Sequence, residues 1–168
     1  MKNTVVIGAG NVLMSDEGVG VHLVRRMGGE FMEPGADAEF VDAGAAGMRL
    51  LHLIAGRARA IIVDCALMGE KPGSMRVFGP EDVKSCKALA GLSLHEGDLL
   101  SVLEVSRRLD ECPRDVVICG IEPASVGPGM ELSPVLSDRM DEYVASIRRL
   151  VSAGAGSRRQ GGGCTSSQ

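Results

Sequence analysis

The chain has 168 residues and a formal net charge of −4, so it is acidic and long enough for one domain with a sizeable core. Apolar residues make up 45% of the sequence but aromatic residues only 2%, and an acidic chain with so few stacking side chains argues against a nucleic-acid partner. No apolar run approaches the roughly 20 residues of a membrane span, and a signal-peptide layout is absent. We therefore expect a cytoplasmic protein with no membrane partner.

Strand and helix signals alternate along the chain. In chain order we predict a strand at 5–7, a helix at 17–27, a strand at 38–41, a helix at 47–55, strands at 60–63 and 75–78, a helix at 95–109, a strand at 115–121 and a helix at 133–151. This alternation predicts a single doubly wound, mostly parallel α/β sheet with helices on both faces. We place the domain at residues 1–151 and expect residues 152–168, which are rich in Gly and Ser, to form a flexible tail.

The turn between the first strand and the first helix is glycine-rich and carries two acids, Asp16 and Glu17. Such a turn often holds a phosphate at this edge of an α/β sheet, but two carboxylates would repel one. Gly8 and Gly10 match the start of a dinucleotide-binding fingerprint, whereas Leu13 occupies its third glycine position. The turn is therefore better suited to a cation, with a nucleotide-binding regulatory module as the alternative.

Three residues are candidate metal ligands. Glu17 follows the first predicted strand and Asp64 ends the third, and such strands commonly flank the switch point of a doubly wound sheet. His95 opens a helix whose start, Ser93-Leu94-His95-Glu96, has capping-box spacing, and the helix dipole there favours a neutral, coordinating imidazole. Two carboxylates and one imidazole suit Ni, Zn or Co better than Mg or Ca. The alternative is that the acids only cap the first helix and that His95 is solvated.

Other catalytic chemistries find little support in the sequence. No CxxC pair occurs, and the number of cysteines is odd, which argues against a disulfide framework or a thiolate zinc site. The G-x-S-x-G elbow and the HExxH helix are both absent. Cys65 adjoins Asp64 and is the strongest candidate for a nucleophile, although no serine or cysteine has a recognisable base partner. His22 and His52 are more typical of packed or partly exposed residues than of ligands.

Five motifs follow one another along residues 4–151: Gly8-x-Gly10-Asn11-x-Leu13-x-x-Asp16-Glu17-x-x-Gly20, the turn from Asp42 to Met48, Val63-Asp64, Ser93-x-His95 and Pro123-x-Ser125. In this order they resemble the hydrogenase maturation endopeptidases, which process the large subunit of nickel–iron hydrogenases. The resemblance implies an aspartyl-type endopeptidase with a doubly wound sheet. It would remove the C-terminal extension of the large-subunit precursor, its protein partner, after nickel insertion. The metal-contacting positions of the family correspond to Glu17, Asp64 and His95.

The same resemblance implies that nickel arrives with the substrate, while Zn or Cd are alternative ions in vitro. Many relatives have Asp-Gly-Gly-Thr where this chain has Asp42-Ala43-Gly44-Ala45, so a side-chain hydroxyl is missing from this turn. Asp42 is our candidate catalytic residue, either to position the substrate backbone or to assist proton transfer. A nickel chaperone that binds the precursor without cutting it is a further alternative to a protease.

Overall fold

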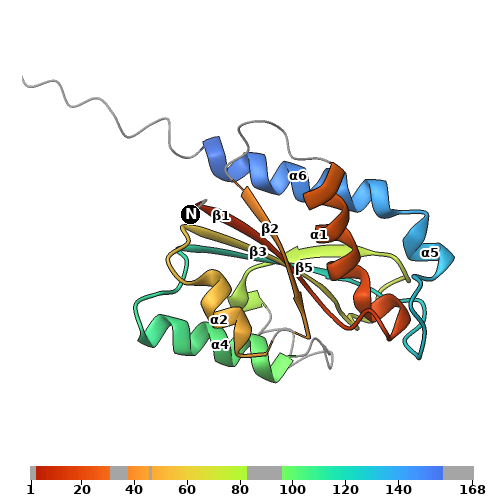
Figure 1. Ribbon diagram of the computed structural model, residues 1–168, viewed down its shortest axis with the longest axis horizontal. Coiled ribbons are helices and arrows are strands. Elements are labelled where there is room, and N and C mark those ends of the chain that lie inside the picture. Colours follow the sequence, from red (N-terminus) through yellow and green to blue (C-terminus); the bar gives the residue numbers. More distant parts are fainter. Residues whose placement is uncertain (1–2, 31–37, 46, 83–95, 157–168) are drawn as a thin grey trace, which may run out of the picture.

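The computed structural model describes residues 3–30, 38–45, 47–82 and 96–156, which surround a five-stranded sheet (Figure 1). Its strands are β1 (Thr4–Ala9), β2 (Ala38–Gly44), β3 (Arg59–Cys65), β4 (Met75–Phe78) and β5 (Asp115–Ile121). The order is β2-β1-β3-β5-β4, and all neighbours are parallel except β4, which pairs antiparallel with β5 at one edge. The predicted doubly wound, mostly parallel sheet is confirmed.

Helices cover both faces of the sheet. They are the 3₁₀ turn η1 (Ser15–Gly18), α1 (Val19–Glu30), α2 (Arg49–Ile54), α4 (Glu96–Arg108), α5 (Pro134–Ser137) and α6 (Met140–Gly156). Figure 1 shows α1 and α6 on one face and α2 and α4 on the other. Because successive residues of a strand point to opposite faces, Val5 and Ile7 join the core under α2 and α4, whereas Val6 joins the core under α1 and α6.

Two predicted helices differ from the structure. The helix predicted at 17–27 begins as η1 and continues in α1 through Gly28 and Gly29 to Glu30. Glycine lowers helix propensity by only about 1 kcal/mol, so packing of the apolar face of α1 outweighs it. The helix predicted at 133–151 is divided into α5 and α6. At this break the Arg139 guanidinium donates to the carbonyl oxygen of Gly73, a tertiary contact that periodicity does not reveal.

The last helix, α6, also ends later in the chain than predicted. Helix α6 extends to Gly156, so residues 152–156, which we assigned to the flexible tail, are helical. Gly154 lies against Arg59 at the start of β3, where a Cβ would be only 2.0 Å from a guanidinium nitrogen. The missing side chain lets Arg59, which pairs with Asp115, fit between α6 and the sheet. Residues 157–168 lie outside the described part of the chain.

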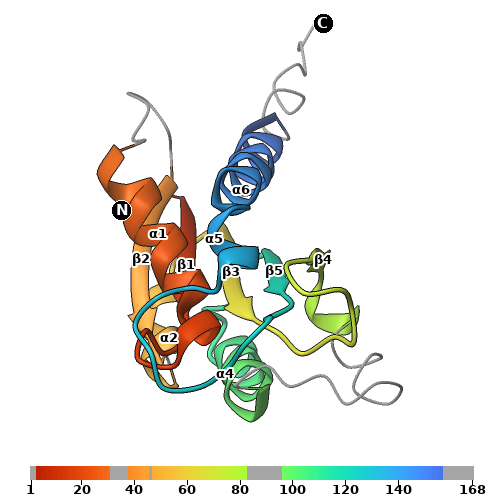
Figure 2. The same ribbon diagram turned by 90° about the vertical axis from the view of Figure 1, so that its right-hand side faces the viewer.

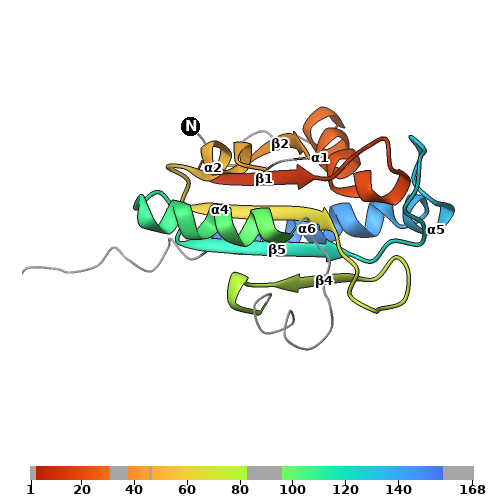
Figure 3. The same cartoon turned by 90° about the horizontal axis from the view of Figure 1, so that it is seen from below.

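The carboxyl ends of β1, β3 and β5 point toward the same end of the molecule (Figure 3). The switch point of the doubly wound sheet lies there, between the neighbours β1 and β3, and η1 and α5 lie at this end too. Ligands of open α/β sheets bind in this position. Across the described ranges, no helix has the length and apolar character needed to span a membrane.

Candidate active site

The glycines of the first turn allow α1 to pack closely on the sheet. A Cβ at Gly8 would lie 2.1 Å from the carbonyl oxygen of Gly20, and one at Gly10 would lie 1.9 Å from that of Glu17. The Gly10 amide donates to the carbonyl oxygen of Gly44 at 2.9 Å. A phosphate site needs several amides that point at the ligand, and the Gly10 amide is already taken up by Gly44 while Asp16 and Glu17 place two acids at the same turn. The geometry therefore disfavours the nucleotide-binding alternative.

Asp16 anchors the loop that follows β5. The residue is fully buried, and its carboxylate accepts four hydrogen bonds. Oδ2 accepts from the amides of Ala124 and Ser125, both at 2.9 Å, and from the Ser133 hydroxyl at 2.8 Å. Oδ1 accepts from the Ser133 amide at 2.7 Å. Asp16 thus joins η1 to the loop between β5 and α5, more than a hundred residues away in sequence. Its side chain does more than cap the first helix, which was the alternative expected from the sequence.

Glu17 and Asp64 reach the same end of the sheet, as the topology predicted. Glu17 is half-buried in η1, and Asp64 near the end of β3 is only 4% exposed. Asp64 Oδ1 accepts the amide of Cys65 at 2.8 Å, and the carboxylates of both acids lie near enough to raise the pKa of the Cys65 thiol. Two carboxylates close together form a negative region that a cation would relieve.

The third predicted ligand, His95, lies outside the described residues, as does its capping partner Ser93. Among the residues that the structure describes, no three Asp, Glu, His or Cys side chains are grouped as a metal site. The trio of Glu17, Asp64 and His95 therefore stays a prediction.

A further buried acid, Glu122, holds a loop at this end of the sheet, a role that sequence reasoning missed. It follows β5 and is 6% exposed. Its Oε2 accepts the amides of Met68 at 2.6 Å and Glu70 at 3.2 Å, so it ties the loop after β3 to the end of β5. In the sequence, only the position of Glu122 directly after a predicted strand could have pointed to it, and many residues in such positions have no comparable role.

Cys65 lies among these acids, and its thiol is not activated. Its pKa is raised to about 12 by burial and then by the carboxylates of Asp64, Glu17, Asp16 and Glu122. A thiol with a pKa this high is protonated at pH 7. Because the thiolate is the nucleophilic form, Cys65 is chemically inert in this environment.

Asp42, the candidate catalytic residue, is held by two internal contacts. Its Oδ2 accepts from the Arg25 guanidinium of α1, at 2.8 Å from Nε and 2.7 Å from Nη2. Its Oδ1 accepts the Gly44 amide at 2.9 Å, and Gly44 has a φ of +57°, a conformation that favours glycine. These contacts make Asp42 an anchor of the turn that follows β2.

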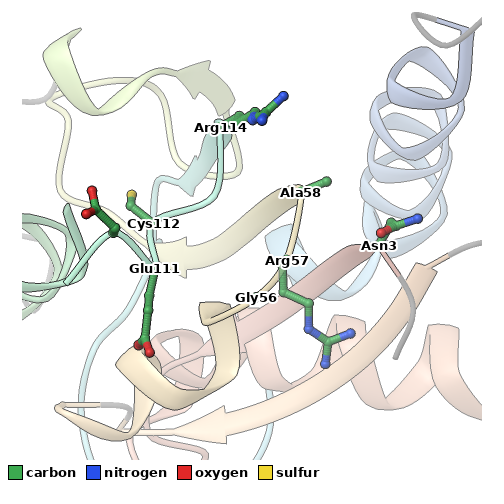
Figure 4. Close-up of a pocket in the computed structure, with 8 residues that line it drawn as sticks. Asn3, Gly56, Arg57, Ala58, Glu111, Cys112 and Arg114 are labelled. Carbon is green, nitrogen blue, oxygen red and sulfur yellow. The ribbon is translucent and has the colours of Figure 1, made fainter.

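A separate pocket lies at the opposite end of the sheet, where β3 and β5 begin (Figure 4). Its lining includes Asn3, Arg57 and Arg114, and the two arginine side chains point in different directions in Figure 4. Arg57 is mostly buried and donates to Glu39 at 2.6 Å. The arginines of this pocket point apart, whereas Asp16, Glu17, Asp64 and Glu122 at the carboxyl ends of the strands all act on the one thiol of Cys65. The candidate active site is therefore at the carboxyl ends.

Known proteins share both the sequence and the fold. Residues 21–150 match the family model described as hydrogenase maturation protease. The chain is 32% identical over 149 residues to the hydrogenase 2 maturation protease of Escherichia coli K12, which covers 85% of this chain and 89% of that protein. It is 28% identical over 153 residues to the hydrogenase expression/formation protein HupD of Rhodobacter capsulatus, with 90% and 72% covered.

A solved structure, the hydrogenase maturating endopeptidase HybD from E. coli, superimposes with a TM-score of 0.80 at 28% identity and covers 90% of this chain and 93% of that one. The fold and these relatives define the chain as an endopeptidase. It belongs to the hydrogenase maturation protease family.

The inert environment of Cys65 leads to a prediction about its role. Cys65→Ala should keep proteolytic activity within about twofold of the unmodified chain, because no covalent thioester intermediate is needed. The measurement is the rate at which the mass of the protein substrate decreases, read by mass spectrometry. Loss of activity by orders of magnitude at an unchanged melting temperature would instead identify Cys65 as the nucleophile.

Proposed function

We propose that this protease removes the C-terminal extension of a nickel–iron hydrogenase large-subunit precursor after nickel has been inserted. In this proposal Glu17, Asp64 and His95 recognise the nickel that the precursor carries. The observation that supports it most directly is that Glu17 of η1 and Asp64 of β3 both lie near the Cys65 thiol, at the end of the sheet where the neighbouring strands β1 and β3 finish. The relatives, which are hydrogenase maturation proteases, support a hydrogenase as the system.

The ligand chemistry favours a metal that belongs to the substrate. Carboxylates with a neutral imidazole are suitable donors for nickel. A protease that holds its own zinc typically uses three ligands such as His₂Glu, often on an HExxH helix, and this sequence has no HExxH. A site with one histidine and no thiolate binds free metal weakly, so it is better suited to contact a nickel ion already held by the precursor. That contact would place the scissile bond beside the acids.

We assign Asp42 to positioning the substrate backbone rather than to proton transfer. Both of its carboxylate oxygens already accept hydrogen bonds, from Arg25 and from the Gly44 amide. A general base needs a carboxylate oxygen that is free to reach a proton of water or substrate, and both oxygens of Asp42 are already engaged within the protein. The turn after β2 that Asp42 holds would then form one side of the substrate-binding edge.

Processing should depend on nickel in the precursor and not on metal added to the enzyme. The experiment compares nickel-loaded precursor, metal-free precursor, and metal-free precursor with added Zn, each incubated with the enzyme and followed by mass spectrometry. Only the nickel-loaded precursor should lose its extension, because the metal contact positions the scissile bond. Efficient cutting of metal-free precursor would rule out that nickel in the precursor is required for cleavage. An unchanged precursor mass together with nickel uptake would favour the non-cleaving chaperone.

A further inference from the structure

Three exposed apolar side chains lie on the two loops that border the candidate active site. They are Leu13, which is 59% exposed, Val126, which is 48% exposed, and Met130, which is 69% exposed. Leu13 belongs to the turn between β1 and η1, and the other two belong to the loop between β5 and α5. Single exposed apolar residues are normal on a protein surface, but a group beside an active site is often functional. We call these three residues the apolar ridge.

The two loops of the apolar ridge are held to each other and to the body of the protein. The Gly129 amide donates to the Leu13 carbonyl oxygen at 2.9 Å, and the Ser15 amide donates to the Gly129 carbonyl oxygen at 2.8 Å. The four hydrogen bonds to Asp16 fix the loop after β5 on either side of Gly129. A hydrogen bond also joins His22 of α1 to the Met130 backbone. A ridge on such fixed backbone loses little conformational entropy when a partner binds.

The position of the ridge ties it to the proposed metal contact. Leu13 precedes Glu17 by four residues, and the loop that carries Val126 and Met130 begins beside the buried Glu122. Figure 2 looks onto this end of the molecule and shows the loop after β5 crossing in front of the first turn. A protein that brings a metal ion to Glu17 must therefore bring the surface around that metal against the two loops.

From this arrangement we infer that the apolar ridge docks an apolar surface of the folded, nickel-loaded precursor next to its metal. The inference rests on the proposed function and names the part of the partner that the enzyme contacts. An extended peptide that adds to a sheet edge needs unused backbone amides and carbonyls. Here the Gly129 amide is bonded to the Leu13 carbonyl, and the Gly129 carbonyl is bonded to the Ser15 amide. These backbone groups are not available to a peptide, so a partner would contact the side chains of the ridge. A few well-packed side chains near the centre of a protein interface contribute most of its affinity, and Met is among the residue types enriched there.

The test compares Leu13→Ser and Met130→Ser with a matched control, Leu109→Ser. Leu109 is 54% exposed, close to Leu13, but it follows α4 at the opposite end of the sheet. For nickel-loaded precursor, each ridge variant should raise KM about tenfold, equivalent to about 1.4 kcal/mol. The value of kcat should stay within about twofold, because the ridge binds the precursor equally well in the ground state and in the transition state. The control should match the unmodified enzyme. All three positions are exposed, so the melting temperatures should stay unchanged.

The outcomes separate this inference from the proposed function. If the unmodified enzyme neither binds nor cuts nickel-loaded precursor, the proposed function is wrong and the inference falls with it. If the enzyme cuts the precursor and both ridge variants keep the original KM, only the inference is overturned. A synthetic peptide of the C-terminal extension serves as a competitor. It should compete weakly, and strong competition that is lost in Leu13→Ser and Met130→Ser would show that the ridge binds the extension instead.

Discussion

Replacing Glu17 by Gln should reduce kcat/KM for nickel-loaded precursor by about 100-fold or more, since even residues that only orient metal ligands typically contribute 10- to 100-fold. Gln has the shape of Glu, so the η1 turn should keep its geometry. The lost charge is the one that would contact the metal, and an amide oxygen is a much weaker donor to a divalent cation than a carboxylate. The melting temperature should not fall, because removing one of the carboxylates around Cys65 reduces the repulsion between like charges there.

A matched control for this prediction is Glu104→Gln. Glu104 is exposed on α4 and pairs with Arg108 at 2.7 Å, so the same chemical change should leave processing unaffected. His95→Ala should lower kcat/KM by a similar factor to Glu17→Gln if both residues contact one metal ion. Full activity of Glu17→Gln, or loss in that variant with full activity in His95→Ala, would contradict the shared metal contact. The rates are measured from precursor masses over time.

Asp16→Asn should lower the free energy of unfolding by about 3 kcal/mol, because a buried charge-assisted hydrogen-bond network loses its acceptor. An Asn side chain carries one oxygen and one NH₂ group. Placed at Oδ1, the NH₂ faces the Ser133 amide, and placed at Oδ2 it faces the amides of Ala124 and Ser125. In either orientation the NH₂ group of Asn faces at least one backbone N–H group, so two hydrogen-bond donors meet and a hydrogen bond is lost. For a domain of this size the expected fall in melting temperature is about 6–12 °C.

Asp141→Asn is the control for Asp16→Asn. Asp141 is 86% exposed and pairs with Arg26 at the surface, so the free energy of unfolding should change by no more than about 1 kcal/mol. Thermal unfolding followed by circular dichroism measures both variants. An Asp16→Asn protein as stable as the unmodified chain would show that the four hydrogen bonds to Asp16 contribute little.

The strands were the most predictable part of the fold. The strands predicted at 75–78 and 115–121 match β4 and β5, and those predicted at 5–7, 38–41 and 60–63 lie within β1, β2 and β3. Buried parallel strands need continuous apolar runs, and turns between them need residues that end such runs, so local sequence carries the information. The helix ends were less predictable, since packing decided that α1 passes Gly28 and that α6 reaches Gly156.

By itself the sequence determined the parallel α/β sheet, because hydrophobic periodicity and the alternation of strands and helices are local properties. It also placed Glu17 and Asp64 at one end of the sheet, since the carboxyl ends of neighbouring parallel strands must meet there. Only the tertiary structure decided that Asp16 is an anchor and that Glu122 fixes the loop after β3. Their hydrogen-bond donors lie 108–117 and 52–54 residues away in the chain, and no spacing rule connects such partners. A buried carboxylate is tolerated where donors converge on it, and convergence is a property of the folded chain.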